Sequence, residues 1–101
     1  MTFNLYLPED RVNHQRHEPF PALYFLAGLT CNQNNAAEKS GFAHFAKKYN
    51  IAVVFPDTSP RNHGVEGANS DWTWGDGAGY YCDATTDKYK KNFNMFTYIN
   101  E

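Results

Sequence analysis

One short segment, Leu26-Ala-Gly-Leu-Thr-Cys31, could bind a negative charge through its backbone. It continues directly from a run of apolar residues, so Gly28 and the backbone N–H groups beside it should lie at the carboxyl end of a strand. N–H groups placed there can stabilise the negative charge that develops on a carbonyl oxygen during acyl transfer. An ordinary strand-to-helix turn explains the same residues equally well, so both interpretations stay open at this point.

The residues that could attack a carbonyl are poorly placed in this sequence. A serine nucleophile on a sharp turn requires Gly-x-Ser-x-Gly, and Ser40, Ser59 and Ser70 all lack the flanking glycines. Cys31 could in principle pair with His44 or His63, but such a pair also needs an orienting acid. Solvated histidines are the preferred explanation, and the sequence predicts no nucleophile within its 101 residues.

Two further sets of residues could contact a substrate. Asp57 and Arg61 lie in the loop after an apolar strand, although Asp-Thr-Ser-Pro-Arg also makes a turn that satisfies its own hydrogen bonds, and we favour the turn. Trp72 and Trp74 could form the wall of a pocket, but tryptophans in a loop more often form a small core of their own.

No metal or cofactor is predicted. His14 and His17 have a spacing that metal ligands can adopt, but no cysteine or carboxylate cluster accompanies them. The glycines of residues 75–79 neither follow a predicted strand nor fit the dinucleotide-binding pattern Gly-x-Gly-x-x-Gly.

Composition points to a folded domain that binds a small molecule. The chain is 42% hydrophobic and 17% aromatic, with a net charge of −2, which gives no electrostatic footprint for nucleic acid or an anionic membrane. Its two cysteines are too few for a disulfide framework, so a reduced, cytoplasmic setting is expected. Since no apolar run approaches the roughly 20 residues of a membrane helix, we expect a soluble protein.

The elements that would position these residues form a strand–helix–strand unit. The apolar runs 22–26 and 51–55 are typical of strands covered on both faces, and residues 35–49 carry one apolar helical face. Such a unit is normally a right-handed βαβ crossover whose ligand crevice lies at the carboxyl ends of the strands. Residues 1–7 alternate, with Phe3, Leu5 and Leu7 on one side and polar or aromatic residues on the other, which predicts a half-buried strand.

The rest of the chain predicts irregular structure and then a helix. Residues 9–20 are expected to form an exposed hairpin-like connection, and residues 60–79 a long loop around two buried tryptophans. From Lys88 onward the apolar spacing predicts a helix that is still running at Glu101. The expected fold class is therefore α/β, with an incomplete sheet.

Five motifs follow one another along the chain: Leu26-Ala-Gly-Leu-Thr-Cys31, Lys39-Ser-Gly41, Pro56-Asp-Thr-Ser-Pro-Arg61, Gly77-Ala-Gly-Tyr-Tyr81 and Asp83-Ala-Thr85. Together they resemble consecutive signatures of the S-formylglutathione hydrolase (esterase D) family, whereas any one alone would be weak. Tyr6-Leu-Pro8 and Asn92-Phe-Asn-Met95 extend the resemblance over essentially the whole chain.

This resemblance implies the N-terminal portion of an α/β-hydrolase, a single domain over residues 1–101 that stops before the nucleophile elbow. It implies a parent serine thioesterase that hydrolyses S-formylglutathione to formate and glutathione in formaldehyde detoxification and also cleaves simple carboxylic esters. The family uses a Ser–Asp–His triad and no cofactor, and all three triad residues would lie beyond Glu101. A homodimer is the oligomer expected of the full-length enzyme.

The resemblance also assigns roles to residues of this chain. Leu29 matches the family's leucine after the glycine, so its backbone N–H is the predicted oxyanion donor. Gly28, Thr30, Cys31 and Trp72 are the predicted substrate-binding residues, and the match favours Trp72 over its neighbouring tryptophan. The thiol of Cys31 could report on oxidation or metals, although a buried structural cysteine is the preferred interpretation.

Three hypotheses follow for the whole protein. The first is an enzyme fragment that supplies one oxyanion donor and is inactive alone. The second is a non-catalytic relic or interaction module derived from a hydrolase, and the third is a sequence cut short from a full-length enzyme. Related serine esterases share this architecture, so the acyl substrate also stays open.

Overall fold

The computed structural model describes residues 1–8, 19 and 21–101. The predicted connection 9–20, with its two histidines, therefore lies almost wholly outside the described residues. Three strands, β1 (Phe3–Tyr6), β2 (Ala22–Tyr24) and β3 (Ala52–Pro56), form one sheet in the order β1-β3-β2. β2 runs parallel to β3 and β1 antiparallel to it, so the sheet is mixed.

The predicted βαβ crossover is present, but its helix is divided. Helix α2 (Gln33–Lys39) and helix α3 (Phe42–Tyr49) meet at Gly41, whose φ is 65°. A residue in the left-handed region ends a helix, and glycine adopts it at little cost. The expected single helix over residues 35–49 is therefore wrong. Asn32 starts α2 four residues after Gly28, because its side chain accepts hydrogen bonds from the N–H groups of Asn34 and Asn35.

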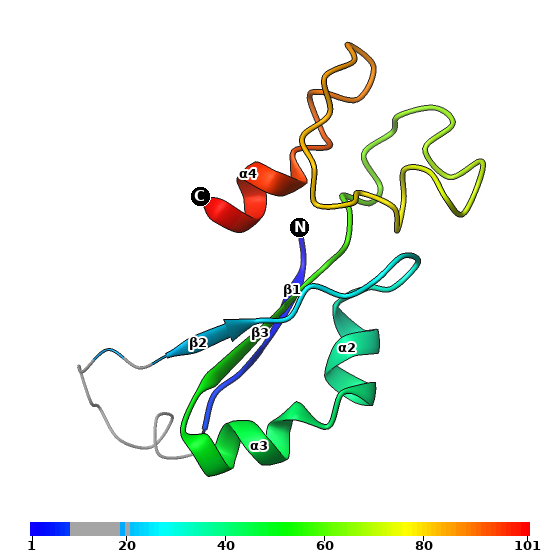
Figure 1. The fold of residues 1–101 in the computed structure, drawn as a ribbon. Coiled ribbons are helices and arrows are strands. Elements are labelled where there is room, and N and C mark those ends of the chain that lie inside the picture. Colours follow the sequence, from blue (N-terminus) through cyan, green and yellow to red (C-terminus); the bar gives the residue numbers. More distant parts are fainter. Residues whose placement is uncertain (9–18, 20) are drawn as a thin grey trace.

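The core lies between the strands and these two helices, which cover the same face of the sheet (Figure 1). Val53 and Phe55 of β3 face Ala36 of α2 and Ala46 of α3, and all four are buried. The rings of Phe25, Phe42 and Phe55 pack against one another at this contact. Strand β3 is thus the buried strand that its apolar sequence predicts.

The outer strands are less buried than predicted. All three residues of β2 are exposed, although its sequence is apolar. In β1 the face with Phe3 and Leu5 is the exposed one, at 53% and 50%. The opposite face is covered instead, because Asn4 donates hydrogen bonds to Gln33 and Asn34 of α2. The predicted alternation in β1 is confirmed, and its more apolar side is the exposed one.

Residues beyond β3 form a long irregular region that ends in helix α4 (Met95–Asn100). The predicted helix from Lys88 is wrong in its start: residues 83 and 94 pair instead as an isolated bridge, and Ala84 N–H donates to Phe93 O at 2.7 Å. Figure 1 places this region and α4 beyond the carboxyl end of β3. None of the described helices is long and apolar enough to cross a membrane.

Gly75 should be the residue of this region least tolerant of a side chain. Its φ is +73°, and a Cβ built on it would lie 2.0 Å from the carbonyl oxygen of Ala68. In the complete protein, Gly75→Ala is expected to lower the free energy of unfolding by about 3 kcal/mol or more, since backbone strain and overpacking add. Gly64→Ala is the matched control, because Gly64 has a φ of +74° and open space around it. Chemical denaturation should show a loss of about 1–2 kcal/mol there; equal losses would contradict the steric argument.

Candidate functional site

The segment after β2 forms a tight turn at the edge of the sheet where the irregular region begins. The N–H of Cys31 donates to the carbonyl oxygen of Gly28 at 3.1 Å, which closes a four-residue turn. Thr30, its third residue, has a φ of 68°, whereas Leu29 is not among the residues with positive φ. This is the pattern of a type II turn. The structure thus shows a sharp turn with several N–H groups close together. This turn is compatible with both interpretations of the segment, the ordinary turn and the anion-binding one.

The N–H of Leu29 is available for a ligand. Within the part of the chain that the structure describes, no group accepts a hydrogen bond from it. The neighbouring N–H groups are used: that of Thr30 donates to Gly77 O at 2.9 Å, and that of Cys31 closes the turn. The Leu29 side chain is partly exposed, so water or a substrate oxygen can approach the residue. A free N–H on a fixed turn is the arrangement that an oxyanion donor needs.

The last carbonyl of this turn is held by the loop after β3. Thr58 Oγ1 donates to Cys31 O at 2.5 Å, and Arg61 Nη2 donates to the same oxygen at 3.2 Å. Thr58 is buried. Two donors from a neighbouring strand end therefore fix the direction in which this peptide group points.

Arg61 is itself held by a buried carboxylate. Its Nε and Nη2 donate to the two oxygens of Asp57 at 2.8 and 3.0 Å, and Thr58 N–H donates to Asp57 Oδ1 at 2.7 Å. The hydrogen bond to Asp57 is the main cause that raises the pKa of Arg61. The hydrogen-bond donors to the Asp57 carboxylate thus all lie within this motif, which agrees with the favoured interpretation of it as a turn.

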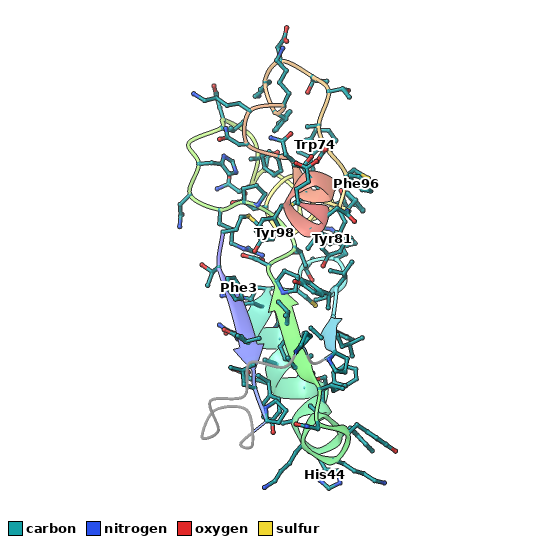
Figure 2. The ribbon with its side chains drawn as sticks, turned by 90° about the vertical axis from the view of Figure 1, so that its left-hand side faces the viewer. Phe3, His44, Trp74, Tyr81, Phe96 and Tyr98 are labelled. Carbon is teal, nitrogen blue, oxygen red and sulfur yellow. The ribbon has the colours of Figure 1, made fainter. Side chains whose placement is uncertain are left out.

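Tyr81 holds the carbonyl of Ala27, the residue directly before the turn. Its hydroxyl donates to Ala27 O at 2.8 Å, across 54 residues of sequence. Burial raises the pKa of Tyr81 to about 12, so the hydroxyl keeps its proton at neutral pH. Figure 2 shows the side chain directed from the irregular region toward the sheet.

Neither histidine proposed as a partner for Cys31 can serve that role in this structure. The N–H of Val65 donates to His63 Nδ1 at 3.0 Å, so the ring proton is on Nε2, which lies 3.0 Å from Asp76 Oδ1. Both nitrogens of His63 are thus occupied. His44 lies on α3, at the end of the molecule away from Tyr81 (Figure 2). Among the described residues, no cluster of three potential metal ligands occurs.

The predicted tryptophan core is wrong. Trp72 is 66% exposed and Trp74 is 53% exposed. Trp74 Nε1 donates to Tyr89 Oη at 3.0 Å, and the two rings make an edge contact. The role of Trp72 in substrate binding stays a prediction.

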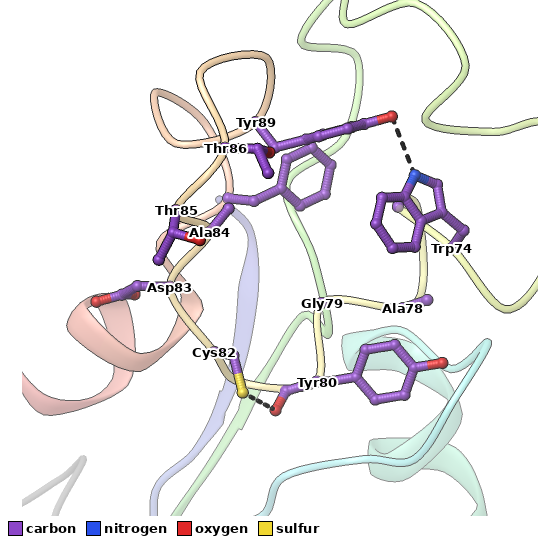
Figure 3. Close-up of a pocket in the computed structure, with 12 residues that line it drawn as sticks. Trp74, Ala78, Gly79, Tyr80, Cys82, Asp83, Ala84, Thr85, Thr86 and Tyr89 are labelled. Carbon is purple, nitrogen blue, oxygen red and sulfur yellow. Dashed lines mark hydrogen bonds between the residues drawn. The ribbon is translucent and has the colours of Figure 1, made fainter.

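An apolar cavity of about 340 Å³ lies in the irregular region, lined by residues that include Trp74, Tyr80, Tyr89 and Phe93 (Figure 3). Sequence patterns did not reveal it, because most of its lining comes from residues 74–86, which form no helix or strand. Trp74, one of the two tryptophans considered as a pocket wall, lines this cavity, whereas Gly28, Leu29, Thr30, Cys31 and Trp72 do not. It is therefore separate from the turn that carries Leu29.

Comparisons with known proteins agree over the entire chain. Residues 1–101 match the model of the Esterase family, described as "Putative esterase". The chain is 41% identical to an S-formylglutathione hydrolase of Mus musculus over 101 residues, and 47% identical to one of Paracoccus denitrificans over 100 residues. These alignments cover 100% and 98% of the chain but 34% of each relative.

A solved structure gives the same result. An S-formylglutathione hydrolase from Agrobacterium tumefaciens superposes with a TM-score of 0.87 at 37% identity, covering 98% of this chain and 34% of that one. The chain thus spans about a third of the length of the relatives that it matches.

Proposed function

This chain belongs to the Esterase family, and from that premise we propose that it is the N-terminal part of a serine thioesterase that hydrolyses S-formylglutathione to glutathione and formate. The expected fold class is confirmed: the chain has the α/β-hydrolase fold of its structural relative, in its N-terminal portion. The substrate is suggested by the names of relatives 41% and 47% identical to this chain. Formaldehyde detoxification is the process that this reaction would serve.

The observation that supports a catalytic contribution from this segment is the unpaired N–H of Leu29 on a turn fixed from both sides. When a nucleophile attacks the thioester carbonyl, its oxygen gains negative charge. An N–H that already points at this oxygen stabilises the charge without reorganising. We propose that Leu29 is one of the two oxyanion donors, the other being supplied beside the nucleophile.

The remaining site residues keep the roles predicted from the sequence. Gly28 and Thr30 form the turn and would lie beside the reacting carbonyl, with the thiol of Cys31 next to them. Trp72 is free to contact a substrate, because most of its side chain is exposed. The Ser–Asp–His triad would be supplied by residues outside these 101, since no Gly-x-Ser-x-Gly occurs among them.

The complete protein is proposed to be cytoplasmic and to act on a small thioester without a cofactor. Both cysteines are free thiols, which is the state that a reducing compartment maintains. The homodimer stays a prediction of the family resemblance.

Hydrolysis of S-formylglutathione by the complete protein is the test of this function. Loss of the thioester absorbance should follow saturation kinetics and stop after treatment with a fluorophosphonate, which labels activated serines. The same site should also cleave nitrophenyl acetate, and S-formylglutathione should inhibit this cleavage competitively. A complete protein that cleaves neither compound would refute the proposal. So would one that cleaves both compounds equally well before and after fluorophosphonate labelling.

A further inference from the structure

We propose that Tyr81 and Thr58 are positioning residues for catalysis: their hydroxyls hold the two ends of segment 27–31 so that the Leu29 N–H points at the reacting oxygen. This inference rests on the proposed function. It deepens that function by assigning roles to two residues that the resemblance did not single out.

The geometry of the two contacts is complementary. Tyr81 Oη donates to Ala27 O at 2.8 Å, before the turn, and Thr58 Oγ1 donates to Cys31 O at 2.5 Å, after it. The donors come from well-separated parts of the irregular region: Thr58 lies just after β3, and Tyr81 lies much further along the chain. Between them the N–H of Thr30 donates to Gly77 O at 2.9 Å. The turn is therefore held at its start, middle and end.

Local backbone strain explains why the turn needs such support. Thr30 has a φ of 68°, a conformation that is unusual for a β-branched residue. Strained residues persist only where the surrounding structure over-determines them. An isolated segment of this sequence would relax out of the left-handed region, and the direction of the Leu29 N–H would change with it.

The middle contact also leaves little room for movement. A Cβ built on Gly77 would lie 3.3 Å from Thr30 Cα, so the two backbones pass close to each other. Ser59 Oγ accepts a hydrogen bond from Gly77 N–H at 2.7 Å. The backbone that receives the Thr30 N–H is thus fixed by the same loop that carries Thr58.

Tyr81→Phe in the complete protein tests the first contact. Removing only the hydroxyl should lower kcat on S-formylglutathione about 10- to 100-fold with little change in KM, because a small misplacement of an oxyanion donor acts on the transition state. Tyr80→Phe is the matched control. Tyr80 has a φ of 51°, close to the 54° of Tyr81, and its hydroxyl donates to Thr73 O at 2.8 Å, away from the turn. This variant should keep the wild-type kcat.

Thr58→Val and Thr58→Ser test the second contact independently. Valine removes the hydroxyl and should lower kcat, whereas serine keeps it and should restore most of the activity. Binding of a trifluoromethyl ketone, which mimics the tetrahedral intermediate, should weaken in parallel with kcat, and thermal unfolding identifies any variant that fails to fold. If one valine or phenylalanine variant does not fold, the other contact still decides the outcome.

The results separate this inference from the function on which it rests. An inactive wild-type protein would refute the proposed function and the inference together. An active wild type whose folded Tyr81→Phe and Thr58→Val variants keep full kcat would overturn the positioning role alone. Equal losses in Tyr80→Phe and Tyr81→Phe would have the same meaning, because they would show a general effect of the region.

Discussion

The isolated 101-residue chain is expected to hydrolyse S-formylglutathione no faster than buffer, whereas the complete protein should turn it over more than about 10⁶-fold faster, since removing a serine triad alone costs about 10⁶-fold in kcat. The chain has a candidate oxyanion donor in Leu29 but no serine flanked by the required glycines. An oxyanion donor lowers the barrier only when a nucleophile attacks. The measurement is a side-by-side thioesterase assay of the two proteins.

Free thiols are the main complication in that assay. Cys31 and Cys82 could exchange with a thioester without catalysing its hydrolysis. A Cys31→Ser/Cys82→Ser variant of the chain provides the control and should leave the same baseline. Fluorophosphonate should label the complete protein and not the isolated chain. A stable acyl adduct on any side chain of the isolated chain, detected by mass spectrometry, would contradict the argument.

The sequence was sufficient for the elements whose burial depends on their own residues. Strand β3 is apolar throughout and all its residues except Val54 are buried, close to the prediction, and its parallel pairing with β2 follows from the crossover between them. The break at Gly41 was also visible in principle, since serine and glycine between two apolar faces form a helix-ending signal. The clear helical spacing of residues 42–49 led to the prediction of one helix that also included residues 35–41.

Burial of the outer strands could not be predicted in the same way. Phe3 and Leu5 are apolar but exposed, because the helices cover the face that carries Asn4 and Tyr6. Which face of a strand is covered depends on where later elements pack. A pattern with period two defines two faces and does not say which one a helix will cover.

The candidate site shows the same division between local and distant information. The turn at Gly28–Cys31 follows from a strand end and a glycine, so the sequence located it. Tyr81 and Thr58 were missed as its supports, because their partners lie 54 and 27 residues away and are backbone carbonyls. Every residue type has a backbone carbonyl, so the sequence does not indicate which carbonyl accepts a hydrogen bond. Only the quoted family motifs around both residues hinted that they belong to one site.

Leu29→Pro in the complete protein is expected to lower kcat on S-formylglutathione about 10²- to 10³-fold while the fold is kept, because proline deletes the proposed oxyanion donor. Leu29 is the second residue of a turn with the type II pattern, and proline is favoured at that position. The preceding residue, Gly28, has no Cβ to clash with the proline ring. The substitution therefore removes one N–H with little other change in the backbone.

Leu29→Ala is the control that separates the N–H from the side chain. It keeps the donor and removes most of a partly exposed side chain, so kcat should fall far less than in the proline variant. The two variants should also differ in affinity for a trifluoromethyl ketone, whose bound oxyanion needs the donor, but much less in KM. Should the proline variant fold normally and retain the kcat of the alanine variant, Leu29 is not an oxyanion donor, and the charge on the intermediate must be stabilised by groups outside this turn.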